Sequence, residues 1–523
     1  MVPPPFIVST CYIGSSCRFF INGTDTDRLA LLKFKAKITD DPLGVLSSWN
    51  DTTHFCQWHG VACGGRNRRV TALSLRSAKL SGTLSPYIGN LSFLGILDHE
   101  NNSLTNEIPP QVGYLHRLSK LYLLNNSFSG GILSNISACS NLLELDVGNN
   151  QLMEKIPPEL SLLSKLQLLN LYGNKFVGTI PPPLGNLSSL LVFDISYNNL
   201  VGTVPGSLAS LKNLQLLYLD FNNLTGIVPS SIFNISSLEV VTMNYNEFER
   251  TLPSDLGISL PKLKYIGIIN NNFVGSIPPS ISNATFLELI QVQKNRLSGA
   301  VPSLSKLQRL RIISVSQNLL GSGAANDLSF LVSLINATNM LVEIESEENN
   351  FGGVLLEGIG NLSTSLQSLS LGFNRIGGTI PSGIQNLVNL EENEFSGSIP
   401  TSLGNLTLLT KLRLGSNQLQ GAIPPTLGNC QNLLEELNMS NNHLSGNISP
   451  QIFSISSLFL LDLSNNDFEG PLPIEVGGLI NVGLLDVSKN KLNGDVPISL
   501  GREKIEFQLL NKADLDLVIP KHF

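Results

Sequence analysis

Apolar residues recur along most of the chain with one spacing, the template LxxLxLxxNxLxGxIP, in which x is usually polar. Residues 166–181 read LQLLNLYGNKFVGTIP and follow it with a single Phe at a leucine position. The asparagine position recurs mostly every 24 residues, at Ala78, Asn102, Asn126, Asn150, Asn174, Asn198, Asn222, Asn246, Asn271, Asn295, Asn318, Asn349, Asn374, Asn393, Asn417, Asn442, Asn466 and Asn490. These eighteen repeats predict one repeat protein and not several globular domains.

Each template position has a physical reason. The LxL core is typical of a short strand whose leucines point inward, so the residues between them lie on the opposite, concave face. The Asn side chain can bond backbone groups of the neighbouring turn, Gly permits that turn, and Pro ends pairing on the flank. One coil cannot bury its own apolar face, so neighbouring coils must stack. We therefore predict an α/β repeat solenoid over residues 70–500, a leucine-rich-repeat superhelix with a concave parallel β-sheet.

Two stretches depart from the template. Asn374 and Asn393 are only 19 residues apart, and the segment NLVNLEENEF runs straight into the second Asn. We expect this shortened repeat, near residues 387–400, to lack the residues of its strand and to be a weak point that proteases cut near residues 390–394. After Gly501 the pattern decays. We expect residues 501–523 to form a divergent tail or one degenerate repeat, and to be a second protease-sensitive stretch.

Charge and hydropathy limit the classes of partner that this chain can bind. The net charge is −7 and no Lys/Arg block interrupts the chain, which argues against nucleic-acid binding. No stretch approaches the roughly 18 apolar residues that cross a bilayer, so we predict no membrane span in this chain. Residues 1–24 hold a modest apolar segment, 6–13, with no basic region before it. They fit a degraded or partial signal peptide, or else a loose N-terminal tail.

Cysteines and glycosylation sequons indicate an oxidising, extracellular setting. Of six cysteines, Cys56 and Cys63 alone lie close together in a Trp-containing segment, which predicts a disulfide. Fifteen Asn-x-Ser/Thr sequons fit a secreted glycoprotein. They are Asn22, Asn50, Asn90, Asn101, Asn125, Asn135, Asn186, Asn223, Asn234, Asn283, Asn336, Asn361, Asn405, Asn438 and Asn447.

The sequons show a phase within the repeat. Six of them fall twelve residues after the template Asn, on the predicted back of the coil: Asn90, Asn186, Asn234, Asn283, Asn361 and Asn405. Either sugars coat the convex side and leave the sheet free, or GNLS is simply the consensus of the repeat. Asn438 lies between two strand residues and is predicted to face the concave side.

Enzyme constellations are absent from the sequence. The six histidines are scattered, and none stands at metal-ligand spacing. His99 replaces the second strand leucine of its repeat, which we interpret as a poorly fitting core residue. Cys139 and Cys430 occupy equivalent places in two coils and are expected to be small buried residues. With no phosphate-binding Gly loop and no kinase motif, we predict no cofactor, no metal and no catalytic residue, and therefore a binding surface.

One column of outward positions is aromatic. Tyr197, Phe221 and Tyr245 directly precede the Asn in three consecutive repeats, and Tyr172 and Tyr218 lie nearby. Aromatic columns suit contact with a peptide or protein, although ordinary packing is the alternative. We predict that a ligand docks on these five residues, in repeats five to nine.

A second outward cluster is acidic, and we interpret it either as a solvated face or as a site for a basic peptide. It consists of Glu343, Glu345, Glu347 and Glu348.

Three stretches resemble the ectodomains of plant leucine-rich-repeat receptor kinases. The LxGxIP half of the repeat resembles the plant-specific class. The segments DTDRLALLKFKAKITDDPLGVLSSW and CQWHGVAC resemble its N-terminal cap, and the long gap containing NDLSFLVSL is similar to the subfamily of the rice bacterial-blight receptor and the bacterial elongation-factor receptor. The resemblance implies a cap over residues 25–69. There we expect a helix carrying Leu29, Leu32 and Ala36 to cover the first coil, with Trp49 and Trp58 filling the joint.

The resemblance also implies a function. Such an ectodomain lies at the outer face of the plasma membrane, binds a peptide or microbial protein for immune or developmental signalling, and pairs with a co-receptor kinase. In that family a second Cys-bearing cap, a transmembrane helix and a serine/threonine kinase follow. This sequence shows none of them, so we expect a truncated receptor. The alternative is a soluble secreted protein, similar to inhibitors of microbial cell-wall-degrading enzymes or a decoy, although such relatives usually have fewer repeats.

Overall fold

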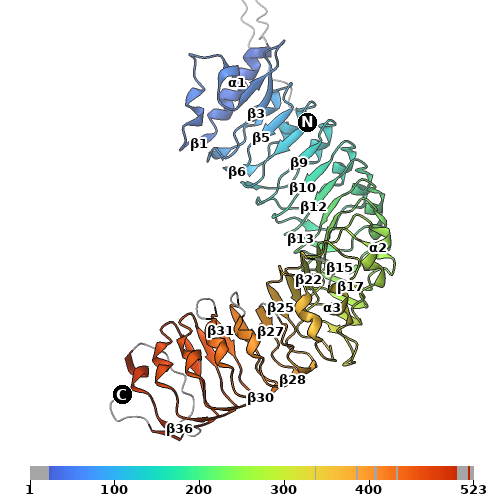
Figure 1. The fold of residues 1–523 in the computed structure, drawn as a ribbon. Coiled ribbons are helices and arrows are strands. Elements are labelled where there is room, and N and C mark those ends of the chain that lie inside the picture. Colours follow the sequence, from blue (N-terminus) through green and yellow to red (C-terminus); the bar gives the residue numbers. More distant parts are fainter. Residues whose placement is uncertain are drawn as a thin grey trace, which may run out of the picture. The chain divides into compact units, whose positions relative to one another are not determined.

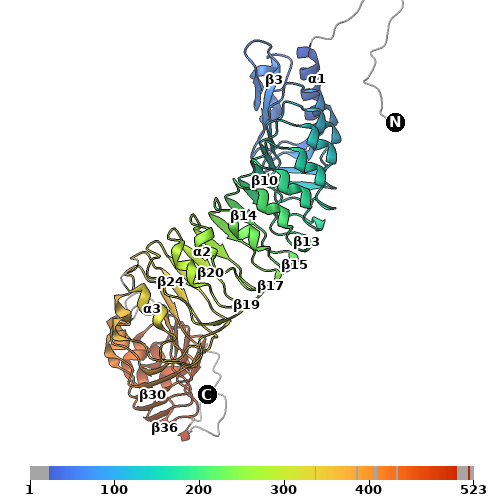
Figure 2. The ribbon, with the colours of Figure 1, turned by 90° about the vertical axis from the view of Figure 1, so that its right-hand side faces the viewer.

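The computed structural model describes residues 23–335, 337, 339–384, 387–405, 409–430, 434–502 and 516–518. The chain divides into two compact units, residues 1–150 and 151–523. Both are built from stacked coils, each with a short inner strand, a turn and an outer segment, and successive coils follow one another in chain order (Figures 1 and 2). The fold is a leucine-rich-repeat solenoid with long parallel sheets, as the template predicts.

Unit 1 begins with the cap helix α1, Gly23–Lys35. The helix buries four residues spaced one helical turn apart, which are Asp27, Ala30, Leu31 and Phe34. The predicted inner face of Leu29, Leu32 and Ala36 is therefore wrong. Leu29 is 49% exposed, and Ala36 follows the end of the helix and is exposed.

A buried carboxylate decides which face of α1 turns inward. Asp27 accepts hydrogen bonds of 2.8 Å from Nε and Nη2 of Arg69 and from the backbone N–H of Val70, at the start of the first strand of the inner sheet. Because the three donors lie in the first coil, the helix must present Asp27 to that coil. A search for apolar spacing alone excludes this residue.

The joint between the cap and the first coil is aromatic, as predicted. Trp49 and Trp58 are both buried and stack with ring centroids 5.3 Å apart. The indole N–H of Trp49 donates to the carbonyl of His59. Cys56 and Cys63 form a disulfide, as their spacing predicts.

Two sheets run through unit 1. In the inner sheet β2 is antiparallel to β3, and the others are parallel: β2 (Val61–Cys63), β3 (Val70–Ser74), β5 (Ile96–Asp98), β7 (Lys120–Tyr122) and β9 (Glu144–Asp146). The second sheet contains β1 (Ile38–Asp40), β4 (Ser81–Thr83), β6 (Ser103–Glu107) and β8 (Ser127–Ser129). The remaining elements are the 3-10 helices η1 (Val45–Ser48), η2 (Phe55–Gln57), η3 (Pro86–Asn90), η4 (Pro110–Tyr114) and η5 (Ser134–Ala138).

The inner sheet of unit 2 places one strand in each repeat, all parallel and in register. Its strands are β10 (Leu168–Asn170), β12 (Val192–Asp194), β14 (Leu216–Tyr218), β16 (Val240–Thr242), β18 (Tyr265–Gly267), β20 (Leu289–Gln291), β22 (Ile312–Ser314), β24 (Glu343–Glu345), β25 (Ser368–Ser370), β27 (Leu387–Asn389), β29 (Lys411–Arg413), β31 (Glu436–Asn438), β33 (Leu460–Asp462) and β35 (Leu484–Asp486). The middle residue of a strand points into the core, as Leu217 does with no exposed surface. The residues on either side of it form the concave face.

The flank of unit 2 carries two further parallel sheets. The first has β11 (Val177–Gly178), β13 (Asn199–Gly202), β15 (Asn223–Ile227), β17 (Glu247–Arg250), β19 (Asn272–Gly275), β21 (Arg296–Gly299) and β23 (Leu319–Leu320). The second has β26 (Gly377–Thr379), β28 (Glu394–Gly397), β30 (Gln418–Gly421), β32 (His443–Gly446), β34 (Asp467–Gly470), β36 (Lys491–Asp495) and β37 (Asp516–Val518). Several of these strands, such as β13, end at the template Gly, which has a positive φ that other residues rarely adopt, for example 79° at Gly202.

Short helices form the outer, convex side of unit 2. They are η6 (Pro158–Leu162), η7 (Pro182–Asn186), η8 (Gly206–Ser210), η9 (Ser230–Asn234), α2 (Leu256–Ser259), η10 (Pro279–Asn283), α3 (Ser329–Leu334), η11 (Glu357–Asn361), η12 (Thr401–Asn405), η13 (Pro425–Asn429), η14 (Pro450–Ser454), η15 (Ile474–Gly478) and η16 (Ile498–Arg502). None of the helices among the described residues has the length and hydropathy of a membrane span.

The template asparagines form a ladder that ties neighbouring coils together. The side-chain amide of Asn198 donates to the carbonyls of Ile195 and Ser196 in its own coil, and to Leu171 in the preceding one, at 3.0–3.1 Å. Its Oδ1 accepts from the N–H of Phe176 at 3.0 Å. One buried side chain thus satisfies four backbone groups that the bend leaves unpaired, which explains why the position is Asn.

The shortened repeat keeps its strand, so the prediction that its strand residues are missing is wrong. Strand β27 pairs with β25 on one side and with β29 on the other. Leu390 is fully buried, and Asn393 makes the same ladder bonds as its counterparts. By residue count the shortening falls between Pro381 and β27, since Leu387 follows Pro381 by six residues, whereas Leu216 follows Pro205 by eleven in a full-length repeat. A paired strand satisfies backbone hydrogen bonds with both neighbouring coils, so it stabilises the stack more than a full-length outer loop does.

We therefore expect the amide hydrogens of Leu390 and Glu392 to exchange with solvent as slowly as those of Leu414 and Ser416, their counterparts in the next repeat. Each of the four N–H groups donates to a carbonyl one coil further along, at 2.8–2.9 Å. Hydrogen exchange read by mass spectrometry on the intact chain measures this. Rapid exchange confined to residues 390–394, or proteolysis there before any other site, would support an open repeat instead.

Candidate ligand-binding face

The aromatic column occupies a strained position of the backbone. Tyr197, Phe221 and Tyr245 have φ of 54°, 50° and 52°, in the left-handed region. The same turn is left-handed in the other repeats, where Asn and Gly are frequent occupants, such as Asn149 and Gly173. Bulky side chains are uncommon there and cost free energy, which Asn and Gly largely avoid. Three consecutive rings at this position therefore indicate a role beyond folding.

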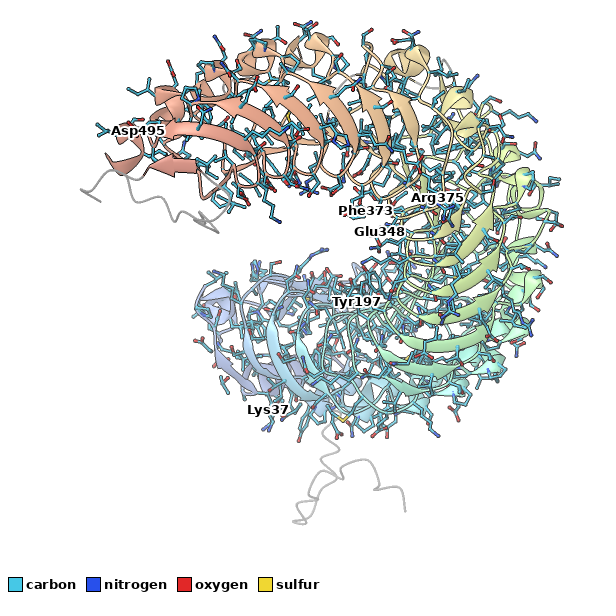
Figure 3. The ribbon with its side chains drawn as sticks, turned by 90° about the horizontal axis from the view of Figure 1, so that it is seen from below. Lys37, Tyr197, Glu348, Phe373, Arg375 and Asp495 are labelled. Atoms are coloured by element: carbon cyan, nitrogen blue, oxygen red, sulfur yellow. A yellow bond between two sulfur atoms is a disulfide. The ribbon has the colours of Figure 1, made fainter. Side chains whose placement is uncertain are left out.

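The rings form one continuous stack. The centroids of Tyr197 and Phe221 lie 4.1 Å apart and those of Phe221 and Tyr245 lie 4.2 Å apart, with nearly parallel planes. Tyr172 adds an edge-on contact, 5.3 Å from Tyr197. The three tyrosines remain 36–46% exposed. Figure 3 shows Tyr197 on the inner side of the unit 2 coils. Four of the five predicted ligand residues therefore share one exposed aromatic surface.

Tyr218, the fifth predicted residue, lies on strand β14 beside carboxylates. Burial raises its pKa, and the negative charges of Asp194 and Asp220 raise it further. Burial also raises the pKa of Asp220, although hydrogen bonds from Thr242 and Asn244 act in the opposite direction. Tyr218 therefore stays protonated and can donate a hydrogen bond.

An apolar strip runs beside the stack, and sequence reasoning missed it. The first residue of each inner strand from β10 to β22 points outward, is half-buried and is apolar or aromatic: Leu168, Val192, Leu216, Val240, Tyr265, Leu289 and Ile312. The strand register lines up all seven. The template marks this position only as x, but seven consecutive apolar residues there were a readable signal.

Most predicted sequons lie away from this face. The six that share the twelve-residue phase are each the last residue of a 3-10 helix and are exposed. Asn438 lies at an outward position of β31, as predicted. Asn22 and Asn336 lie outside the described residues. No sequon falls on an inner strand between β10 and β22, so attached sugars would leave the apolar strip accessible.

Two sequons belong to a polar counterpart of the aromatic column in unit 1. The amide of Asn125 donates to Asn101 at 2.6 Å, and that of Asn149 donates to Asn125 at 2.7 Å. These asparagines share the left-handed turn position. The column thus carries either stacked amides or stacked rings, and the backbone alone does not require aromatic residues.

The described residues contain no group of His, Cys, Asp and Glu side chains placed to hold a metal ion. Cys139 and Cys430 are buried thiols outside the disulfide, as expected, and burial raises the pKa of the Cys139 thiol to about 11. A thiol that is buried and protonated is a poor nucleophile.

Comparison with known families places the chain among leucine-rich-repeat proteins. The leucine-rich-repeat N-terminal domain matches residues 24–64, and leucine-rich-repeat models match residues 141–163, 165–187, 183–224, 365–387, 408–430, 433–455 and 457–479. The Arabidopsis thaliana LRR receptor-like serine/threonine-protein kinase EFR is 48% identical over 95 residues, which are 18% of this chain and 9% of the relative. A grapevine (Vitis vinifera) polygalacturonase inhibitor is 37% identical over 93 residues, 18% of this chain and 27% of the inhibitor. These matches span less than a third of either relative.

Solved structures resemble the chain over most of its length. The ectodomain of the Arabidopsis thaliana receptor kinase GASSHO1/SCHENGEN3, in complex with CASPARIAN STRIP INTEGRITY FACTOR 2, superimposes with a TM-score of 0.73 at 30% identity, over 91% of this chain and 62% of the receptor chain. The Arabidopsis receptor kinase HAESA, in complex with the peptide hormone IDA and the co-receptor SERK1, gives 0.70 at 27% identity, over 92% and 93%. The chain is therefore related to plant leucine-rich-repeat receptor ectodomains.

Proposed function

We propose that this chain is the ligand-recognition module of a plant receptor of the leucine-rich-repeat kinase type. Its ligand is an extended peptide, or a peptide segment of a microbial protein, that lies along the concave sheet of repeats five to nine. By analogy with HAESA, whose complex contains a co-receptor, the bound module pairs with a co-receptor kinase. Its place is the extracellular face of the plasma membrane, in agreement with the disulfide in the cap.

The observation that carries the proposal is the exposed ring stack on three left-handed turns. Folding does not need aromatic residues there, since Asn serves the same turn elsewhere. The stack borders the apolar strip, so together they offer a flat apolar surface with ring faces, which suits peptide side chains. The strands beneath are regularly spaced and parallel, so the surface is rigid before the ligand arrives, which lowers the cost of binding.

The test replaces Tyr197→Asn together with Phe221→Asn. Asparagine is well tolerated in the left-handed turn, and neither change creates a sequon, so the variant should fold. Random 12-residue peptides displayed on phage are selected on the wild-type chain, and the affinities of the selected peptides are then measured on both proteins. We expect the double variant to lose at least about 2 kcal/mol of binding free energy, roughly 30-fold in Kd.

Tyr114→Asn is the matched control, because Tyr114 is 59% exposed at the end of η4 and far from the stack in sequence. This variant should bind like the wild type. Circular dichroism and the melting temperature establish that each variant is folded. Equal affinity of the folded double variant would place the site elsewhere, on the flank sheets or the segment 321–340.

A further inference from the structure

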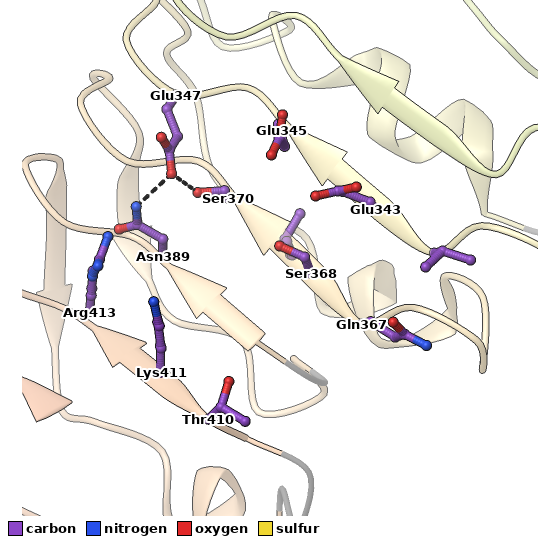
Figure 4. Close-up of a pocket in the computed structure, with 12 residues that line it drawn as sticks. Glu343, Glu345, Glu347, Gln367, Ser368, Ser370, Asn389, Thr410, Lys411 and Arg413 are labelled. Atoms are coloured by element: carbon purple, nitrogen blue, oxygen red, sulfur yellow. Dashed lines mark hydrogen bonds between the residues drawn. The ribbon is translucent and has the colours of Figure 1, made fainter. Parts of the chain in front are cut away.

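A hollow of about 520 Å³ opens on the concave face of unit 2, beyond the end of the apolar strip. It exists because β25 carries only Ser368 and Ser370 at its outward positions, while long charged side chains stand on β24, next to it on one side, and on β29, beyond β27 on the other. Figure 4 shows the carboxylates of β24 on one side of the hollow and Lys411 and Arg413 on the other. Its walls are Glu343, Glu345 and Glu347 on one side and Lys411 and Arg413 on the other.

The basic wall is already neutralised within the protein. Arg413 donates from Nε and Nη2 to the two carboxylate oxygens of Glu436, at 2.7 and 2.9 Å. The ammonium group of Lys411 lies 4.0 Å from the same carboxylate. Nη1 of Arg413 also lies 4.0 Å from Oε1 of Glu391. The two cations are thus matched by the two carboxylates of Glu436 and Glu391, and the basic wall offers little net charge to a ligand.

The acidic wall has no such partner. Among the described residues no Lys, Arg or His nitrogen lies within 4.0 Å of Glu343, Glu345 or Glu347, whereas Glu239 of the same unit pairs with Lys264 at 2.7 Å. Glu345 accepts from the hydroxyl of Ser314 at 2.6 Å. Glu347 accepts from Ser370 and, at 2.7 Å, from the amide of Asn389.

Glu343 and Glu345 stand two residues apart on one strand, so their carboxylates share one side of the sheet. Burial raises the pKa of Glu343, and the charge of Glu345 raises it further. Two carboxylates that are partly desolvated and repel each other would be stabilised by a cation placed between them. The cavity beside them gives such a cation room.

The strand register sets the distance from this wall to the stack. Glu343 is the next residue in line after Ile312, at the end of the apolar strip. From β14, in the middle of the aromatic stack, to β24 there are five strand steps, or about 24 Å at about 4.8 Å each, which an extended peptide covers with about seven residues.

We propose that the hollow receives the guanidinium or ammonium group of a basic ligand residue, placed about seven residues from the apolar residue that contacts the aromatic stack. The inference rests on the proposed function and adds the charge and the spacing of the ligand. A guanidinium suits the pair best, since its planar donors can reach two carboxylates at once.

The experiment compares phage-displayed random 12-residue peptides selected on the wild-type chain with those selected on a Glu343→Gln, Glu345→Gln variant. Glutamine keeps the shape and removes the charge. We expect wild-type selections to be enriched in Arg or Lys six to eight positions from an apolar or aromatic residue, and the variant selections to lose that basic enrichment while keeping the apolar one. Asp462→Gln with Asp486→Gln is the control, because it removes two carboxylates from the same sheet outside the hollow without creating a glycosylation sequon.

A selected peptide resynthesised with citrulline in place of its Arg should bind the wild type at least tenfold more weakly, and the Glu343→Gln, Glu345→Gln variant about equally in both forms. If basic residues are not enriched, or are enriched equally on both proteins, the hollow does not read ligand charge. That result leaves the proposed function intact, provided that the Tyr197→Asn, Phe221→Asn variant still loses the peptides. If every peptide selected on the wild type binds the Tyr197→Asn, Phe221→Asn variant equally well, the proposed function itself is wrong.

Discussion

Asp27→Ala is expected to destabilise the cap by about 3–5 kcal/mol, which is the usual cost of removing one partner of a buried ion pair. Asp27 is fully buried, and the side chain of Arg69 is only 15% exposed. Without the carboxylate, the guanidinium keeps its charge in a poorly solvated place and the N–H of Val70 loses its acceptor. Both groups belong to the coil that α1 covers, so the helix should detach before the repeats unfold.

The chain allows this local event to be measured directly. Its two tryptophans, Trp49 and Trp58, are both in the cap, so urea unfolding followed by tryptophan fluorescence reports on the cap. Asp25→Ala is the control, because Asp25 lies on the exposed side of the same helix. It should change the stability by no more than about 1 kcal/mol, the usual contribution of a charge near a helix end. If both variants lose equally little, the buried pair does not hold the cap.

The repeat fold was predictable because each template position has one physical role. The Asn position is an example, since the side chain of Asn198 bonds backbone groups of its own and the preceding coil. The cap helix was less predictable. Apolar spacing favoured Leu29, Leu32 and Ala36, but a buried Asp with three donors outweighs apolar residues that can remain at the surface. The shortened repeat was misread for a similar reason. The template spacing shows only that five residues are missing from this repeat. It does not show where they are missing, and the structure keeps the strand paired on both sides.

Part of the candidate site could also be predicted from the sequence, and part could not. The aromatic column follows from repeat position alone, so Tyr197, Phe221 and Tyr245 could be placed together from the sequence. That their turn is left-handed requires backbone angles, whereas the apolar strip beside it could have been read from the repeat position of its seven residues. The hollow could not be predicted from the sequence. It depends on Ser368 and Ser370 standing between long side chains from repeats of unequal length, where template spacing runs from 31 residues, Asn318 to Asn349, to 19 residues.

The second large effect concerns His99, which takes the place of a strand leucine under the cap. The ring is fully buried and stacks on Phe34 of α1, with centroids 5.0 Å apart and nearly parallel planes. Neither ring nitrogen has a hydrogen-bond partner among the described residues. The core reading of this residue is confirmed, and the ring is part of the contact that holds α1. Burial lowers the pKa of His99 to about 3, far below its ordinary value of 6.5.

This shift makes the cap sensitive to acid. Between pH 6.5 and about 3 the unfolded chain binds a proton at His99 and the folded chain does not, so stability falls as the pH falls. Above pH 6.5 the ring is neutral in both states and contributes no pH dependence. Each pH unit inside the window is worth about 1.4 kcal/mol, so lowering the pH from 7.5 to 4.5 should remove about 3 kcal/mol.

His99→Leu restores the template leucine and removes the titrating group, so its cap should lose about 3 kcal/mol less than the wild type over the same interval. Urea unfolding followed by tryptophan fluorescence, at pH 7.5, 6.0 and 4.5, gives the difference between the two proteins. Other groups titrate as well. Burial raises the pKa of the neighbouring Glu100, an effect that favours the folded state at low pH, but that group is present in both proteins and largely cancels in the difference. A difference that stays constant with pH would show that the His99 site admits the proton in the folded state, and that the stack on Phe34 opens without unfolding the cap.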